Sequence, residues 1–247
     1  MTRILRLATG LGAPIVFVLV LVAVLEPACA QAPSQDEIAR SPFDDDEGEL
    51  RPLRDPLRPM NHAFFVVNDR LYFWAVRPAA DGYRFVVPRQ ARIGVRNFFA
   101  NLAGIRRGLN CLLQGRTKAS GTEFARFGVN TTIGILGLTD PARAWLKLRG
   151  IEGDFGQTLG TWGMGPGWFL TWPLLGPSTG RDTLAWPLDA VLDPATFIPG
   201  AGLIKKINHV SLNPGEYEDL IESALDPYVA VRDAYHQHRE HLVRKHR

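Results

Sequence analysis

Residues 92–115 read RIGVRNFFANLAGIRRGLNCLLQG, a pattern that predicts an amphipathic helix. Apolar residues recur along it at steps of four and three, at Phe98, Leu102, Ile105, Leu109 and Leu112. Asparagine and glutamine fall off that line, and Gly115 is a typical C-terminal stop. Because a helix with one apolar face must bury it, the stretch is expected to pack against another element.

Two glycines, Gly104 and Gly108, lie four residues apart inside this predicted helix. Each costs roughly 1 kcal/mol against alanine in helix propensity, so a compensating contact is expected. Glycines at this spacing let a second backbone approach closely, either in a lipid-exposed helix or in a tight crossing of soluble helices. We therefore take both as candidate helix-packing residues.

C-terminal to this stretch, aspartate–proline pairs divide the chain into short helices. The pattern predicts a helix over 122–133 and a short one from Pro141 to Leu148, capped by Asp140. The same pair recurs further along the chain, and Asn213-Pro214 resembles it. One apolar face extends over 217–235, on both sides of Asp226-Pro227, and predicts helix before and after that pair.

Two aromatic segments stand apart from this helical pattern. A dense apolar segment extends from Phe64 to Val76, and Arg77-Pro78 is expected to stop it. Residues 155–172 alternate five glycines with large aromatic side chains, which favours a hairpin or a looped elbow over a helix.

The composition is that of an ordinary globular protein. Of the 247 residues, 46% are hydrophobic and 21% are charged, which excludes wholesale disorder. The net charge of +3 is a weak basis for nucleic-acid binding, so we expect no nucleic-acid partner.

The first thirty residues, 1–30, have the three parts of a secretory signal peptide. Arg3 and Arg6 precede an apolar run over 11–25 that is short of the ~20 residues that span a bilayer. Cleavage after Ala30 and lipidation of Cys29 are both open, although Leu25 lies one place too far upstream for the usual lipidation motif. Residues 31–54 then predict an acidic, flexible linker.

One catalytic pattern is present. Gly176-Pro177-Ser178-Thr179-Gly180 fits the G-x-S-x-G turn of serine esterases, and Asp193 and His209 follow in the chain order of that fold. No βαβ units surround the turn, so a periplasmic lipid esterase using Ser178 is the alternative hypothesis and a plain turn is preferred. We expect no enzyme activity.

No cofactor or metal is expected either. Gly163 to Gly167 lacks the lysine and hydroxyl residues of a nucleotide-binding loop. Four histidines crowd the C-terminus, but no cysteine or well-placed carboxylate completes a metal site. Residues 240–247 are therefore expected to form a basic, His-rich tail.

An ordered set of short motifs over 55–239 resembles the VacJ/MlaA lipoproteins. The set comprises Asp55-Pro56-Leu57 with Asn61, Arg77-Pro78, Asn97-Phe98, Leu113-Gln114-Gly115, Arg126-Phe127, Asp154 to Gly160, Gly176-Pro177-Ser178 with Arg181-Asp182, and Asp226-Pro227-Tyr228. No single motif is specific, whereas the ordered set is. The chain departs from the family at Glu26-Pro27-Ala28-Cys29 and at Pro59-Met60.

The resemblance implies a ring-like, mainly α single domain over 55–239, in the inner leaflet on the periplasmic side of the bacterial outer membrane. It implies non-enzymatic translocation of mislocalised glycerophospholipid through an amphipathic channel. The implied partners are the membrane, an outer-membrane trimeric porin and a soluble periplasmic lipid carrier. On this basis four aromatic residues are candidates for lipid contact or for framing the channel mouth, with core packing the open alternative: Trp162, Trp168, Phe169 and Trp172.

Overall fold

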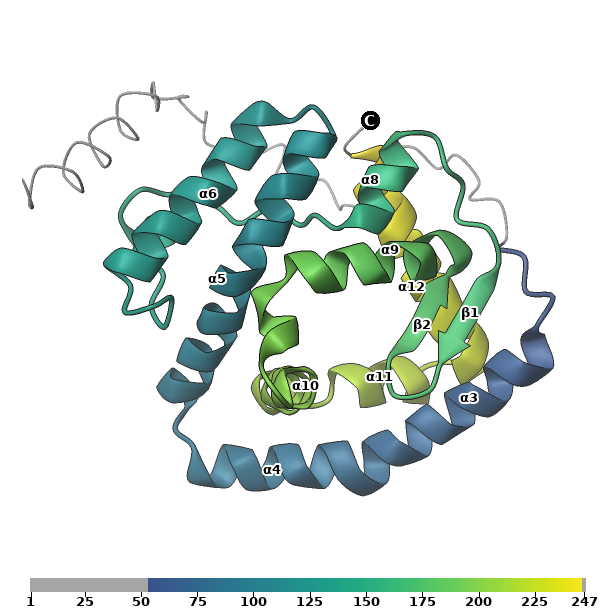
Figure 1. The fold of residues 1–247 in the computed structure, drawn as a ribbon. Coiled ribbons are helices and arrows are strands. Elements are labelled where there is room, and N and C mark those ends of the chain that lie inside the picture. The colour runs from purple at the N-terminus through teal and green to yellow at the C-terminus, as the bar shows by residue number, and fades with distance from the viewer. Residues whose placement is uncertain (1–52, 246–247) are drawn as a thin grey trace, which may run out of the picture. The chain divides into compact units, whose positions relative to one another are not determined.

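The structure, a computed structural model, describes residues 53–245 and is mostly helical (Figure 1). The predicted signal peptide, Cys29 and nearly all of the predicted linker lie outside the described residues. In chain order the elements are α3 (Arg58–Leu71), the π-helix η1 (Tyr72–Val76), α4 (Arg77–Val86), α5 (Arg89–Leu113), α6 (Thr117–Thr132), α7 (Pro141–Ala144), α8 (Phe155–Thr161), β1 (Phe169–Trp172), β2 (Gly176–Thr179), α9 (Gly180–Leu192), the 3₁₀ helix η2 (Pro194–Phe197), α10 (Ala201–Leu212), α11 (Glu216–Glu222) and α12 (Pro227–Arg244).

The first helices form one continuous rod, because α3, η1 and α4 follow one another without a break. The prediction that Arg77-Pro78 stops the apolar segment is wrong. Pro78 lies inside this rod, in the first turn of α4, where a proline ring would ordinarily clash with the preceding turn. The wider π turn of η1 directly before it accommodates the proline ring without ending the helix.

Helices α5 and α6 pack as an antiparallel pair, which confirms the helix predicted over 92–115 and the one predicted over 122–133. Gly104 and Gly108 are both buried in α5 and face α6. A Cβ at Gly108 would lie 2.9 Å from Cζ of Phe124, and Ser120 Oγ donates a hydrogen bond to the Gly108 carbonyl, 2.8 Å away. The missing side chain therefore brings the two helices together.

Three aspartate–proline pairs cap the helices that follow them, whereas Asp55-Pro56 does not, because Leu57 is the N-cap residue of α3. Asp140, Asp193 and Asp226 each accept hydrogen bonds from backbone N–H groups in the first turn that follows. The helix after Asp140 ends at Ala144, earlier than expected. Asn213-Pro214 does not repeat the device, because Gly215, with φ 90°, is the residue before α11.

Residues 155–172 contain both a helix and half of a hairpin, so the expectation that they hold no helix is wrong. Asp154 caps α8 by accepting a hydrogen bond from the N–H of Gln157, 2.8 Å away. The glycines of α8 serve close packing, since a Cβ at Gly160 would lie 2.7 Å from Cγ2 of Val243. The second half is strand β1, which pairs antiparallel with β2 from Phe169↔Thr179 to Trp172↔Gly176.

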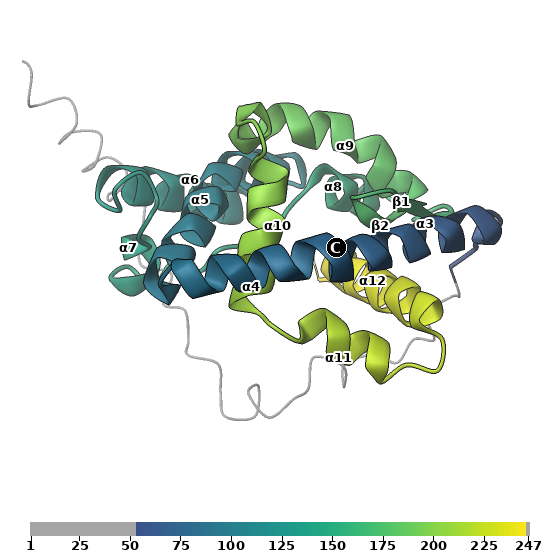
Figure 2. The same cartoon turned by 90° about the horizontal axis from the view of Figure 1, so that it is seen from below.

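The described residues belong to one compact unit, and their elements follow one another around a ring. In Figure 1 the rod of α3 and α4 runs along the lower edge, α5 rises from its end, α9 crosses above, and the β hairpin closes the far side. Figure 2 shows α10 crossing the rod, with α9 on one side and α11 and α12 on the other. The prediction of a ring-like, mainly α single domain with a Gly/Trp-rich hairpin is confirmed.

Two further features bear on the predicted organisation. Within 53–245, no helix is both long and apolar enough to cross a bilayer. Residues 240–244 do not form the separate tail that was expected. They are the last residues of α12, which continues to Arg244 and buries Leu242 and Val243. Those two apolar residues explain why the basic segment packs instead of remaining solvated.

Candidate functional site

A cavity of about 340 Å³ lies between the rod, the hairpin and the C-terminal helices. Its volume is within the range of small-molecule sites, and its walls are mainly aromatic and aliphatic. The residues that line it include Phe65, Asn68 and Tyr72 of the rod, Phe169 and Leu175 of the hairpin, Lys206, His209 and Val210 of α10, Glu216, Tyr217 and Leu220 of α11, and Tyr228 and Val231 of α12.

Three aromatic rings form an apolar wall of this cavity. Tyr228 meets Phe65 edge-on at a centroid distance of 5.8 Å and Phe169 at 6.0 Å. The Tyr228 hydroxyl donates a hydrogen bond to Asp55, and burial raises the pKa of Tyr228 above its usual value. The wall is therefore fixed at its polar edge and presents carbon to the cavity.

The hairpin turn at the cavity is held by polar side chains from two helices. Asn68 donates from Nδ2 to the Trp172 carbonyl at 2.9 Å and accepts from the Leu174 N–H at 2.7 Å. Lys206 donates from Nζ to the Leu174 carbonyl at 3.3 Å. Leu174 has φ 67°, an uncommon backbone angle for a non-glycine residue, and these three bonds stabilise it.

Helix α11 is attached to the rod by reciprocal tyrosine–carboxylate hydrogen bonds. Tyr72 donates to Glu218 at 2.8 Å, and Tyr217 donates to Asp69 at 3.2 Å. Arg77 adds an ion pair with Glu218 at 3.3 Å. Burial, reinforced by the adjacent carboxylates, raises the pKa of both tyrosines, so both hydroxyls remain donors. No residue of α11 is itself buried, so these contacts are its main attachment to α3 and η1.

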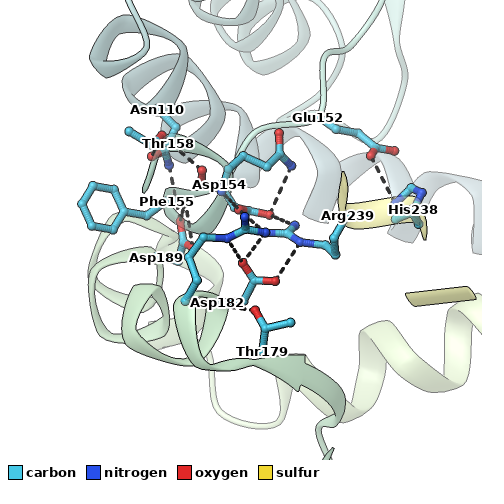
Figure 3. Close-up of polar contacts among 12 residues, drawn as sticks. Asn110, Glu152, Asp154, Phe155, Thr158, Thr179, Asp182, Asp189, His238 and Arg239 are labelled. Carbon is cyan, nitrogen blue, oxygen red and sulfur yellow. Dashed lines mark hydrogen bonds and ion pairs between the residues drawn. The ribbon is translucent and has the colours of Figure 1, made fainter. Parts of the chain in front are cut away.

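A buried ionic network joins α8, α9 and α12 behind the hairpin (Figure 3). Arg239 bonds to both Asp154 and Asp182, at 2.9 Å from Nη2 to each carboxylate. Arg181 is 1% exposed and bonds to Asp182 at 3.1 Å. Although burial opposes it, the guanidinium of Arg239 holds the pKa of Asp154 and of Asp182 below the usual value. Arg181-Asp182 is thus an ion pair inside the fold.

Asp189 lies beside that network and has the opposite electrostatic balance. Burial raises its pKa to about 6, against the attraction of Arg106 and with the repulsion of Asp154. Its carboxylate accepts the N–H of Phe155 at 3.0 Å (Figure 3). It also lies 3.6 Å from Nη1 of Arg106.

The structure brings one of the four aromatic candidates into the cavity wall. Phe169 is 1% exposed and lines the cavity. Trp172 lies at the hairpin turn and is partly exposed, and its indole N–H donates a hydrogen bond to Thr183 Oγ1. Trp162 and Trp168 are more than half exposed and do not line the cavity. Contact of all four with lipid stays a prediction.

Sequence reasoning missed several cavity residues. The sequence pattern puts Tyr217 on an apolar helical face. No residue near it in the sequence indicates that its hydroxyl contacts Asp69. Lys206 could have been found from the sequence, because Lys205 and Lys206 are two adjacent charged residues in the mainly apolar segment 201–212.

The residues proposed for a serine esterase do not form a triad. Ser178 Oγ lies 3.1 Å from Thr183 Oγ1, whereas His209 contacts Asn213 and Glu216. Asp193 accepts the N–H of Ala195 at 2.9 Å and lies near Lys205. Ser178 also stands on a two-stranded antiparallel hairpin, not on a parallel sheet. The geometry therefore gives no support to catalysis by Ser178.

Within residues 53–245, no three His, Cys, Asp or Glu side chains gather closely enough to hold a metal ion. His238 lies 3.7 Å from Glu152 (Figure 3), and Cys111 is buried in α5.

The comparisons with known proteins agree with one another. A family model described as "MlaA lipoprotein" matches residues 53–242. "Intermembrane phospholipid transport system lipoprotein MlaA" of Shigella flexneri is 32% identical over 205 residues, covering 81% of this chain and 80% of the relative. The protein of the same name from Escherichia coli is 31% identical over 205 residues, with the same coverage.

A solved structure is also similar. A chain from a study of the "structural basis for maintenance of bacterial outer membrane lipid asymmetry" superimposes with a TM-score of 0.69 at 33% sequence identity. The match covers 76% of this chain and 98% of that one.

Proposed function

The chain belongs to the MlaA lipoprotein family, and from that membership we propose that it is the outer-membrane component of an intermembrane phospholipid transport system. In this proposal the cavity between the rod, the hairpin and α10–α12 is part of an amphipathic path for glycerophospholipid. The observation that carries it is a cavity with apolar walls inside a ring of amphipathic helices. The substrate class, phospholipid, is that of the transport system to which the Shigella flexneri and Escherichia coli relatives belong.

The physical need for such a path follows from the hydrophobic effect. Moving a two-chain lipid through water exposes about thirty methylenes at ~0.8 kcal/mol each, a barrier of over ~20 kcal/mol. Aromatic and aliphatic walls such as those of Phe65, Phe169 and Val210 lower this barrier by replacing the water contact of the acyl chains. No bond is made or broken, so the proposed function is non-enzymatic.

The direction and the partners are further parts of the proposal. The protein removes phospholipid from the outer leaflet, works from the periplasmic side of the outer membrane, and delivers its cargo to a soluble periplasmic carrier. A trimeric porin is the proposed neighbour in the membrane. Trp162, Trp168 and Trp172 are proposed to contact lipid, since their rings are exposed and tryptophan favours the boundary between lipid and water.

The proposed organisation is a signal peptide over 1–30, an acidic linker over 31–54 and the lipid-channel domain from residue 55. Mass spectrometry of the mature N-terminus distinguishes an acylated Cys29 from a free Gln31.

The test is a cavity-filling substitution in cells that lack the wild-type gene. Val210→Trp places an indole in the cavity, and we expect it to raise surface-exposed phospholipid to the level of the deletion strain. Leu203→Trp is the matched control, because Leu203 lies on the same helix, is 60% exposed and does not line the cavity. Unchanged surface phospholipid on deletion of the gene refutes the function. Normal transport by a folded Val210→Trp protein refutes the path.

A further inference from the structure

Two adjacent lysines of α10 have different surroundings. Lys205 faces away from the cavity, with Nζ 3.9 Å from Asp193 and 5.7 Å from the centre of the Phe99 ring. Lys206 lines the cavity, and its ammonium group donates a hydrogen bond to the Leu174 carbonyl at 3.3 Å. Lys206, one residue after Lys205 in α10, therefore places an ammonium group in the mainly apolar cavity.

The charge of Lys206 has no counter-charge in this part of the chain. Among residues 53–245, no carboxylate lies within 4 Å of its Nζ, whereas Lys205 has Asp193. Burial lowers the pKa of Lys206, with no nearby charge acting on it. A cation that is partly desolvated and bound to one neutral carbonyl retains N–H donors for a further acceptor.

The acidic groups around the cavity have partners of their own. Glu216 lies 3.2 Å from Nε2 of His209, Glu218 accepts from Tyr72, and Asp69 accepts from Tyr217. None of them neutralises Lys206. Among the residues that the structure describes, Lys206 therefore gives the cavity an exposed ammonium group beside apolar walls, which is complementary to an anionic group attached to hydrocarbon.

We propose that Lys206 binds the phosphate of a phospholipid whose acyl chains contact the apolar walls of the cavity. The proposal rests on the proposed function, which it deepens by assigning the headgroup contact. An ammonium recognises phosphate as a point charge, so the site selects lipids by their phosphate and not by the rest of the headgroup.

The experiment measures lipid retention by the purified full-length protein in detergent, using native mass spectrometry. The probes are dioleoyl phosphatidylglycerol, dioleoyl phosphatidylcholine and dioleoylglycerol, which share their acyl chains and differ in phosphate. For the wild type we expect both phospholipids to bind about tenfold more tightly than dioleoylglycerol, the effect of one charge-assisted hydrogen bond. Lys206→Glu abolishes that preference, Lys206→Arg keeps it, and Lys205→Glu leaves it unchanged.

Three outcomes overturn the proposal in distinguishable ways. If Lys206→Glu keeps the preference for phosphate, the headgroup contact is elsewhere and the proposed function stands. If Lys205→Glu abolishes it as well, the effect is general electrostatics and not this site. If the wild type retains no lipid, both proposals fall. Inorganic phosphate is the final probe, since competition by it at equal concentration marks a free-anion site instead of a lipid site.

Discussion

The hydroxyl of Tyr217 donates a hydrogen bond to Asp69, 148 positions away in the chain, and so joins α11 to the rod beside the cavity. The neighbouring bond from Tyr72 to Glu218 runs in the opposite direction, and the two rings meet at a centroid distance of 4.5 Å. Helix α11 contributes Glu216, Tyr217 and Leu220 to the cavity wall. Its attachment therefore determines how that side of the cavity is closed.

Replacing both tyrosines with phenylalanine is expected to loosen α11 while leaving the aromatic packing in place. Hydrogen bonds to charged groups are worth about 1.5–3 kcal/mol each, and partial exposure of α11 places this case at the low end. Together the two bonds contribute roughly 3 kcal/mol, so we expect amide hydrogen exchange over Glu216–Glu222 to accelerate about a hundredfold in Tyr72→Phe/Tyr217→Phe. Tyr83→Phe, which removes the bond to Asn208 between α4 and α10, is the control that leaves this exchange unchanged.

Gly160→Ala is expected to destabilise the fold by about 1–3 kcal/mol, the usual effect of overpacking a core. Its Cβ would lie 2.7 Å from Val243 and 3.0 Å from Arg181, both buried. Gly82→Ala is the matched helical control. Nothing lies within 4 Å of its Cβ, so it gains about 0.5–1 kcal/mol from helix propensity. The check is the midpoint of denaturant unfolding, and equal midpoints for the two variants contradict this packing.

Asp189 is expected to give the protein a stability that falls as pH rises from about 4 to about 6. Its pKa is about 6 in the folded chain and about 3.9 when unfolded, so the folded state binds the extra proton in that window. The full effect is about 2–3 kcal/mol, since one pKa unit is worth about 1.4 kcal/mol.

Asp189→Asn is expected to flatten this slope, because asparagine still accepts the Phe155 N–H without titrating. The measurement is unfolding free energy across pH 4 to 6. Asp154 and Asp182 act in a different window, because their lowered pKa values contribute stability that is lost as pH falls below about 4. A wild-type curve that rises from pH 4 to 6 contradicts the assignment.

Ser178→Ala is expected to leave phospholipid transport in cells unchanged. Its hydroxyl forms a hydrogen bond with Thr183 inside the fold. We therefore expect the variant to lose about 1 kcal/mol of unfolding free energy and no catalytic group. Surface-exposed phospholipid is the readout. A transport defect in a folded Ser178→Ala protein revives the esterase hypothesis.

Local signals in the sequence predicted the helices that depend on local interactions. The apolar period of 92–115 predicted α5, and Asp140 and Asp226 predicted caps, because these signals act within a few residues. The predictions failed where distant contacts decide. Gly156 and Gly160 occupy a helix because Asp182, Val243 and Arg181 approach it from elements far along the chain. Pro78 continues a rod because a π turn precedes it, and no short pattern encodes that turn.

The candidate site was predictable only in part for the same reason. Phe169 stood out among the glycines and aromatics, and the structure places it in the cavity wall. Lys206 and Lys205 are indistinguishable by type and neighbourhood in the sequence. Only the register of α10 against the rod and hairpin separates their environments.

The π turn of η1 sets the rotational phase between the two halves of the rod. A π turn holds about one residue more than an α turn, which advances about 100° per residue, so refolding the same five residues Tyr72–Val76 as a regular α-helix would turn α4 by about that angle relative to α3. Asn68 would still reach the hairpin, but Tyr83 would no longer face Asn208. Changes that turn these five residues into a regular α-helix of the same length should therefore be poorly tolerated, because they twist the ring instead of altering one contact.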